Sequence, residues 1–270
     1  MPGQAVAHAG RTGDDRRVSD YRNIVILTGA GISAESGLAT FRGADGLWEG
    51  HRVEDVATPG AFRRDPALVH HFYDARRARL AEVEPNAAHN ALARLDAAWS
   101  GELLLVTQNV DDLHERAGSK RLLHMHGELK RGWCLACGER FAWEGPMGEG
   151  AVCPDCTTAG QVRPDIVWFG EMPYEMERID QALSRADLFV SIGTSGAVYP
   201  AAGFVQTARY CGAHCLEMNL EPSQGSIFFH ESLIGPAGQL VPAWVDALLA
   251  TPTNPARCRD RGRGPRPSAD

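Results

Sequence analysis

Four of the seven cysteines form two closely spaced pairs, Cys134 with Cys137 and Cys153 with Cys156. Each pair has two residues between its members, and fifteen residues separate the pairs. This spacing brings four thiolates together on two tight turns, as in zinc ribbons. Four sulfur ligands leave no coordination position for water, so we predict one structural zinc ion. The remaining cysteines lack such partners and are expected to be core or tail thiols: Cys211, Cys215 and Cys258.

A glycine-rich turn follows an apolar run near the start of the chain. The run 24–28 leads directly into Gly29-Ala30-Gly31-Ile32-Ser33-Ala34. Such a turn before a helix can accept a dinucleotide pyrophosphate, because glycine lets the phosphates approach the backbone. It can also form without a ligand, since glycine adopts conformations closed to other residues. No acidic residue for a ribose follows on a second strand; residues 36–48 instead form a glycine-studded stretch typical of a lid.

Three further polar segments each follow an apolar run: residues 108–111, 193–195 and 219–221. The carboxyl ends of parallel strands meet at one sheet edge, and open α/β sheets bind ligands there. A single segment of this kind is usually an ordinary loop. Three at the same edge indicate a binding site.

The elements that would position these groups alternate between short apolar runs and amphipathic stretches, which predicts an α/β fold with a parallel sheet. The expected strands are Asn23 to Thr28, Glu102 to Thr107, Ile166 to Phe169, Leu188 to Ile192 and His214 to Met218. The expected helices are Pro66 to Val83, Ala87 to Ala98, Met176 to Ala186, Ala201 to Tyr210 and Pro242 to Leu249. We expect one main domain over residues 23–249, a zinc module inserted at about 132–160, and disordered tails at 1–22 and 251–270.

Charge and hydropathy narrow the possible partners. The formal net charge of −7 disfavours nucleic acid as a general partner. No stretch approaches the ~20 apolar residues needed to span a bilayer, and the first residues lack the apolar core of a secretory signal. We therefore expect a cytoplasmic protein with neither nucleic acid nor membrane as partner.

Several short motifs, in this order, resemble the signature of the sirtuin family. They are Gly29 to Ser33 with Thr40-Phe41-Arg42, Thr107 to Asp111, His124-Met125-His126-Gly127, Gly193-Thr194-Ser195 and Asn219-Leu220-Glu221. The resemblance spans about residues 23–249 and is closest to the bacterial and mitochondrial class that removes malonyl and succinyl groups. It implies a Rossmann-like domain, a smaller zinc-bearing domain, and NAD bound with an acyl-lysine peptide in the cleft between them.

The resemblance also implies which residues contact the cofactor. The positions that match the family's NAD contacts are Gly29, Ala30, Gly31, Phe41, Arg42, Gln108, Asn109, Asp111, Gly193, Thr194, Ser195, Asn219, Leu220, Glu221 and Ala237. Of these, Asn109 and Asp111 are expected to act in catalysis with His126.

His126 is the expected general base, because imidazole titrates near neutral pH. His124 lies two positions earlier, and spacing alone does not choose between them. The His-Gly pair of the family selects His126. In the implied reaction the acyl oxygen attacks the nicotinamide ribose and expels nicotinamide; His126 then assists a ribose hydroxyl, giving free lysine and O-acyl-ADP-ribose.

Tyr73 and Arg76 lie three residues apart in a predicted helix and therefore share a face. From residue type and helix position alone, we would interpret them as a half-buried tyrosine and a solvated arginine. They match the Tyr-x-x-Arg pair that desuccinylases use to bind an acyl carboxylate, and Ala44 matches a small residue beside it. Arg77, one position round the helix, is expected to take no part.

Two other functions share some of these features. A protein ADP-ribosyltransferase would use the same NAD site but transfer the ribose to a nucleophile on its target. A zinc-ribbon binding module would leave the glycine turn vestigial and would need a basic, aromatic surface. Acidic residues offset the basic residues near the cysteines, and His126 with the Tyr73–Arg76 pair favours deacylation of lysine side chains.

Overall fold

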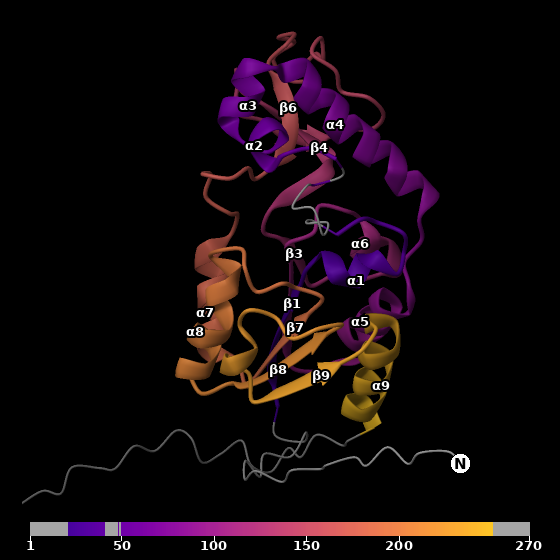
Figure 1. Ribbon diagram of the computed structural model, residues 1–270, viewed down its shortest axis with the longest axis vertical. Helices are drawn as coiled ribbons and strands as arrows, with labels where there is room; N and C mark the ends of the chain where they lie inside the picture. Colours follow the sequence, from indigo (N-terminus) through magenta and orange to yellow (C-terminus); the bar gives the residue numbers. More distant parts are fainter. Residues whose placement is uncertain (1–20, 41–47, 49, 251–270) are drawn as a thin grey trace, which may run out of the picture.

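The computed structural model describes residues 21–40, 48 and 50–250, and a parallel sheet forms the centre of its larger part (Figure 1). Its six strands lie in the order β3-β2-β1-β7-β8-β9, and every neighbouring pair is parallel. They are β1 (Asn23–Thr28), β2 (Glu102–Thr107), β3 (Leu122–His124), β7 (Leu188–Ile192), β8 (His214–Asn219) and β9 (Glu231–Ile234). This arrangement confirms the predicted α/β fold.

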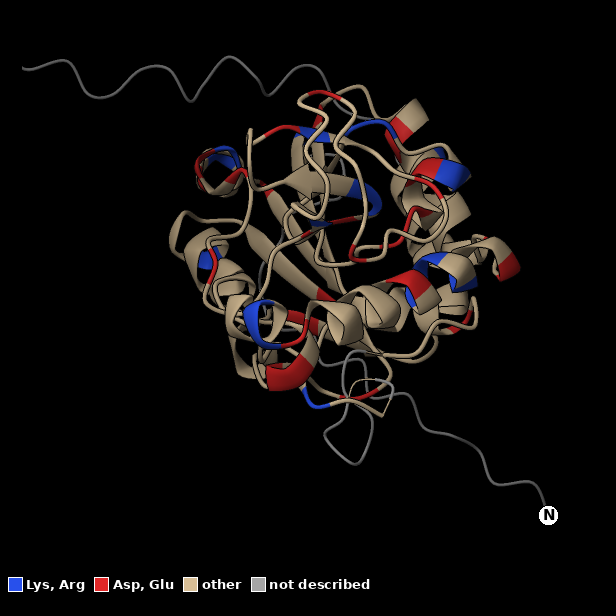
Figure 2. Ribbon diagram, turned by 90° about the horizontal axis from the view of Figure 1, so that it is seen from above, with Lys and Arg blue, Asp and Glu red and all other residues tan. Residues whose placement is uncertain are grey.

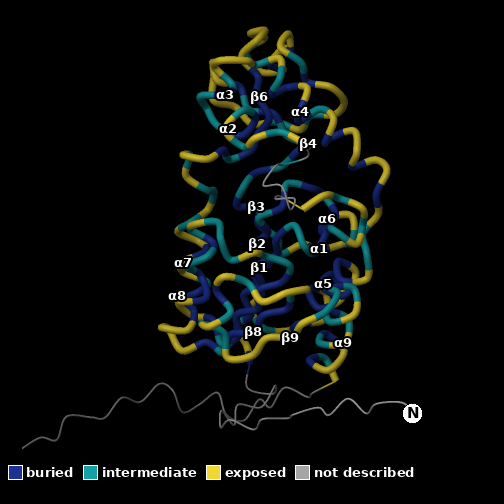
Figure 3. Tube along the Cα trace, in the orientation of Figure 1, coloured by how far each residue is buried: buried dark blue, intermediate teal, exposed yellow. Residues whose placement is uncertain are grey.

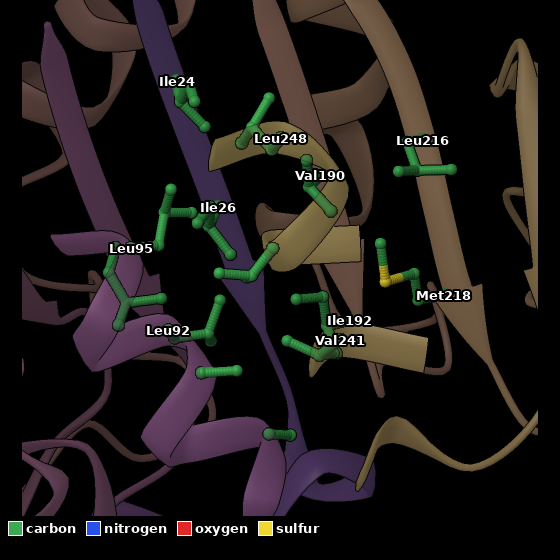
Figure 4. Close-up of a cluster of buried hydrophobic side chains, with 14 of the residues drawn as sticks. Ile24, Ile26, Leu92, Leu95, Val190, Ile192, Leu216, Met218, Val241 and Leu248 are labelled. Carbon is green, nitrogen blue, oxygen red and sulfur yellow. The ribbon is translucent and has the colours of Figure 1, made fainter. Parts of the chain in front are cut away.

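Side chains alternate between the two faces of this sheet, so each face has its own core. On one face, Ile24 and Ile26 pack against α5 (Ala87–Ala98) and α9 (Ala237–Ala250), as Figure 4 shows. On the other face, Val25 and Leu27 pack against α7 (Met176–Arg185) and α8 (Phe204–Tyr210). Buried residues accordingly run along the strands in Figure 3. The sheet is packed on both faces, and the ends of its strands therefore offer well-defined positions for a site.

A second, three-stranded antiparallel sheet lies in the smaller part of the molecule, in the order β5-β4-β6. Its strands are β4 (Gly127–Cys134), β5 (Arg140–Ala142) and β6 (Val162–Ile166). The helices α2 (Val53–Val56), α3 (Pro59–Arg64) and α4 (Pro66–Arg79) share an apolar core with β4 and β6. The expected zinc module, 132–160, falls within this part, whose strands extend beyond both ends of that range.

The remaining elements are short. They are the helices α1 (Ala30–Ala34) and α6 (Leu113–Ala117), and the 3-10 helices η2 (Leu80–Glu82), η3 (Ala201–Gly203) and η4 (Ser226–Phe228). Among the described residues, no helix has both the length and the apolar character needed to cross a membrane.

One predicted strand was wrong. The run from Ile166 to Phe169 is not a strand of the parallel sheet: β6 ends at Ile166 and pairs with β4 in the small sheet. The strand itself contains Arg163 and Asp165, which are buried because they are paired with Glu171 and Arg140. A search for apolar runs does not find such a strand, since charges are buried only when they have partners. The helix expected to begin at Pro242 begins five residues earlier, at Ala237.

Candidate functional site

A cavity of about 740 Å³ lies between the two parts of the molecule. Its floor is the carboxyl-end edge of the parallel sheet, and its roof includes α4 and the segment after β6. This volume is within the range of cofactor and substrate sites. Three of the polar segments identified in the sequence line it: Gln108 to Asp111, Gly193 to Ser195 and Asn219 to Glu221.

His126 lines the cavity and is half-buried. Its Nδ1 lies 3.2 Å from the carbonyl oxygen of Gln108. A carbonyl can only accept, so Nδ1 carries the proton and Nε2 keeps its lone pair in the neutral ring. Burial lowers the pKa of His126 below its usual value, and the Gln108 carbonyl offsets part of that effect. The neutral imidazole is therefore the favoured form near pH 7, as a general base requires.

His124 lies on β3 and does not line the cavity. Its Nδ1 is 3.0 Å from the carbonyl of Asn109, and its Nε2 is 2.6 Å from the carboxylate of Glu115. Burial lowers the pKa of His124, but the hydrogen bond and charge of Glu115 outweigh it and raise the pKa above the usual value. Both ring nitrogens are thus engaged, and this geometry separates two histidines that spacing alone could not.

A buried hydrogen-bond network connects Asn109 and Asp111 to the glycine turn. The Asn109 amide donates to the carbonyl of Gly29 at 3.2 Å and to Ser33 Oγ at 3.0 Å. Ser33 in turn donates to Asp111 Oδ2 at 3.0 Å. Burial raises the pKa of Asp111. The network fixes the polar atoms of two loops relative to each other before any ligand binds.

The two glycines of the turn are required by contact with another loop. A Cβ on Gly29 or Gly31 would lie 2.8 or 2.7 Å from backbone atoms of Gly193. Gly31 donates its amide to the Gly193 carbonyl at 2.8 Å, and Gly193 itself has a φ of +62°. Steric necessity between two strand-end loops therefore explains these glycines as fully as approach to a phosphate does.

The other expected dinucleotide contacts divide into three groups. Those that line the cavity are Ala30, Thr194, Ser195, Asn219, Leu220 and Glu221. Gln108 donates to Thr194 Oγ1 at 3.2 Å and Asn219 donates to the Thr194 carbonyl at 2.7 Å, so these loops also support one another. Ala237 does not line the cavity; it begins α9 and packs in the sheet core. Phe41 and Arg42 lie outside the described residues. So do Ala44, which was expected beside the acyl group, and residues 1–20 and 251–270 of the expected tails.

Tyr73 and Arg76 both line the cavity from α4, and both are buried. The guanidinium carbon of Arg76 lies 3.3 Å from the ring centroid of Phe72 and 4.5 Å from that of Trp48. Burial raises the pKa of the Tyr73 phenol well above its usual range. The phenol remains neutral at physiological pH and can donate a hydrogen bond beside a buried cation, an arrangement suited to a carboxylate.

Arg77 has a structural task that the sequence did not reveal. It is buried, with Nε 2.6 Å from the Leu129 carbonyl and Nη1 2.5 Å from Asp74. Asp74 also accepts from the amides of Met147 and Gly148. Arg77 therefore links α4 to β4 and to the loop between the cysteine pairs. An Arg77 variant would consequently not serve as a neutral control for an Arg76 variant.

The four paired cysteines converge as predicted, with all four Sγ atoms within 4.8 Å of one another. Cys134 and Cys156 are 3.7 Å apart, and Cys137 and Cys153 are 3.8 Å apart. These distances are too long for disulfides, whose sulfurs lie about 2 Å apart. They equal the roughly 3.8 Å between ligands of a tetrahedral zinc ion with bonds of about 2.3 Å. The donor set therefore fits one zinc ion, held away from the cavity.

Several cavity residues were missed in the sequence. Ser33 lies within a recognised motif, but nothing there indicated that it would link Asn109 to Asp111. Trp168 was hidden inside an apolar run interpreted as a strand. Trp48 and Tyr199 also line the cavity and had no distinguishing spacing.

Known proteins resemble this chain along most of its length. The model of the Sir2 family matches residues 29–200. The NAD-dependent protein deacylase of Bdellovibrio bacteriovorus is 58% identical over 231 residues, which are 85% of this chain and 97% of the relative. A protein of the same name from Shewanella oneidensis is 56% identical over 232 residues, 85% of this chain and 96% of the relative.

Solved structures of Sir2 proteins are also similar to this chain. A Sir2 homologue in complex with NAD superposes with a TM-score of 0.78 at 38% identity, covering 86% of this chain and 91% of that one. A second structure, Sir2Af2 bound to a myristoylated histone peptide, has a TM-score of 0.67 at 32% identity, covering 86% and 92%.

Proposed function

Because the chain belongs to the Sir2 family, we propose that it removes succinyl and malonyl groups, with acetyl groups as poorer substrates, from lysine side chains of proteins. At the coarser level it is an NAD-dependent protein deacylase with one structural zinc ion. Residues 23–249 would form the catalytic domain. The histone peptide held by a solved relative supports protein lysines as the substrates.

The preference for acidic acyl groups rests on one observation: Tyr73 and Arg76 lie together in the cavity, buried and on the same helix. A buried guanidinium is stabilised by an anion, and an acyl carboxylate would supply one. An acetyl group would place a methyl group there instead. Arg76 would bind the carboxylate and Tyr73 would donate a second hydrogen bond to it.

The rest of the cavity suits NAD and the proton transfer. When bound, NAD would supply the glycosidic bond to nicotinamide, which breaks as the acyl carbonyl oxygen bonds to the ribose carbon that nicotinamide leaves. The loops at 193–195 and 219–221 would hold the adenosine half at the sheet edge, and Gln108, Asn109 and Asp111 would orient the nicotinamide ribose. His126 would accept the ribose hydroxyl proton at Nε2, since Nδ1 donates to Gln108. With one water molecule consumed as the lysine amine is released, the products would be nicotinamide, free lysine and O-acyl-ADP-ribose.

The test compares succinyl and acetyl versions of one peptide with Arg76→Met and Tyr73→Phe. A charge-assisted hydrogen bond contributes roughly 1.5–3 kcal/mol, on the order of a tenfold to hundredfold effect on rate. Arg76→Met should lower kcat/KM for the succinyl peptide by that factor and change the acetyl value little. Tyr73→Phe should act in the same direction but less, because it removes a neutral hydrogen bond.

Arg94→Met is the matched control. Arg94 lies on α5, is half exposed and pairs with Asp246 at the surface, so neither specificity constant should change much. An equal fall for both peptides in Arg76→Met would show that the arginine is structural and would overturn the acidic-acyl preference.

A further inference from the structure

Among the described residues, the Tyr73 hydroxyl has one hydrogen-bond partner, the indole of Trp168. The distance from Trp168 Nε1 to Tyr73 Oη is 3.0 Å, and the two residues are 95 positions apart in the chain. Both side chains are almost completely buried, and both line the cavity. The contact joins α4 to the segment after β6 at the place where we propose that the acyl group binds.

The direction of this hydrogen bond is fixed by chemistry. An indole nitrogen only donates, so the Tyr73 oxygen must accept. A phenol that accepts one bond still has its own proton to give, and that proton cannot point toward the indole. With its acceptor side occupied, Tyr73 can offer the acyl group a donor.

Trp168 is itself held firmly. The guanidinium carbon of Arg163 lies 3.3 Å from its ring centroid, and Phe62 lies 5.3 Å away. Arg163 bonds both oxygens of Glu171, at 2.7 and 3.0 Å, and Glu171 accepts the backbone amide of Trp168 at 2.8 Å. The position of the indole N–H is therefore set by a partly buried ion pair as well as by packing.

We propose that Trp168 is a positioning residue for acyl selectivity: its indole N–H occupies the acceptor side of the Tyr73 hydroxyl and directs the hydroxyl proton to the carboxylate of a succinyl or malonyl group. This rests on the proposed function. Trp168 does not touch the carboxylate. It acts through Tyr73, and without Tyr73 it has no influence on the choice between acidic and neutral acyl groups.

A double-mutant cycle tests this. Trp168→Phe keeps an aromatic ring and removes the N–H; Tyr73→Phe keeps the ring and removes the hydroxyl. The ratio of kcat/KM for succinyl and acetyl peptides should fall about twofold to tenfold in Trp168→Phe, the size of one neutral hydrogen bond. In a Tyr73→Phe background, Trp168→Phe should lower the ratio no further. Replacement of Trp168 by 3-benzothienylalanine, which has nearly the shape of tryptophan but no N–H, should reproduce the fall if the smaller ring of phenylalanine disturbs the fold.

Melting temperature gives a second readout. Tyr73→Phe leaves the buried indole N–H without its acceptor, whereas the double variant removes both partners, so the double variant should lose less stability than the two single losses added together.

An equal fall of the ratio in both backgrounds, or no fall with benzothienylalanine, would overturn the role of Trp168. Failure of the proposed function looks different: the wild-type protein would show no preference for the succinyl peptide, and Arg76→Met would not change the ratio.

Discussion

His124 and His126 differ in what their ring nitrogens contact. His124 faces a carbonyl and a carboxylate, two acceptors, so both nitrogens bear protons and the ring has no lone pair to offer. His126 faces one carbonyl and lines the cavity. The two carbonyl groups that accept these hydrogen bonds belong to neighbouring residues of one loop, Gln108 for His126 and Asn109 for His124. His124 therefore supports the loop, and His126 is left to exchange a proton.

We predict that His126→Ala lowers deacylation by roughly 10²–10⁴-fold, the usual contribution of a positioned general base. His71→Ala, which removes an exposed histidine of α4, should leave the rate unchanged. Substantial activity in a folded His126→Ala protein would remove the assignment.

The pH profile checks the same residue independently. Since burial lowers the pKa of His126, its neutral, active form persists below pH 6.5. The acidic limb of kcat/KM should therefore have its midpoint below that value, with activity lost as the pH falls through it. A midpoint above 6.5 that is unchanged by ionic strength would contradict the burial argument.

At the scale of elements, the strands β4, β5 and β6 and the cysteine turns have a small apolar core of their own. Metal binding contributes folding free energy in such modules.

We predict that Cys153→Ser removes the zinc, lowers the melting temperature and inactivates the enzyme, because β4 and β6 also support α4. Cys211→Ser, at an exposed cysteine outside the cluster, should change neither zinc content nor melting temperature. A Cys153→Ser protein that keeps both would show that the four thiolates do not bind the metal.

The sequence predicted the elements whose burial follows from apolar periodicity, such as β1, β2 and α5. It did not predict β6, because Arg163 and Asp165 are buried through ion pairs with Glu171 and Arg140, which only the folded chain brings into contact. Nor did it predict β3 and β9, the edge strands of three and four residues, which are too short for a period. The site residues divide in the same way. Those that lie in sequence motifs were predicted, whereas Trp168 and Arg77 were missed because they act through contacts that form only in the folded chain.

At the scale of the whole molecule, positively and negatively charged residues are interspersed along the ribbon in Figure 2. This distribution is compatible with the net charge of −7. It favours recognition of ligands inside the cavity over recognition by a charged surface. The cavity draws its floor from the parallel sheet and its roof from the part that the zinc cluster supports. Any change that loosens one part relative to the other should therefore affect binding of both NAD and the acyl group.

Acid stability depends on histidines buried in the larger part. His89 accepts the Asn86 amide at Nδ1 and lies 3.4 Å from Ser33 at Nε2, and burial lowers its pKa to about 4. His114, 4.9 Å from His89 between ring centroids, also has its pKa lowered well below the usual value by burial. An unfolded chain would protonate both near pH 6.5. The unfolded state thus binds more protons below that pH, and stability must fall as the pH falls.

We predict that the free energy of unfolding decreases from pH 6.5 down to about pH 4, with His89 contributing on the order of 3 kcal/mol at most. Asp111, whose pKa is raised by burial, acts in the opposite direction, because its protonation relieves a cost present at neutral pH. His89→Gln isolates the histidine: it cannot titrate, so urea unfolding between pH 7 and pH 4.5 should show a smaller loss than in the wild-type protein. The exposed His71→Gln variant should follow the wild-type curve. If His89→Gln also follows it, the imidazole is not held neutral by burial, and the acid sensitivity must come from His114 or from carboxylates.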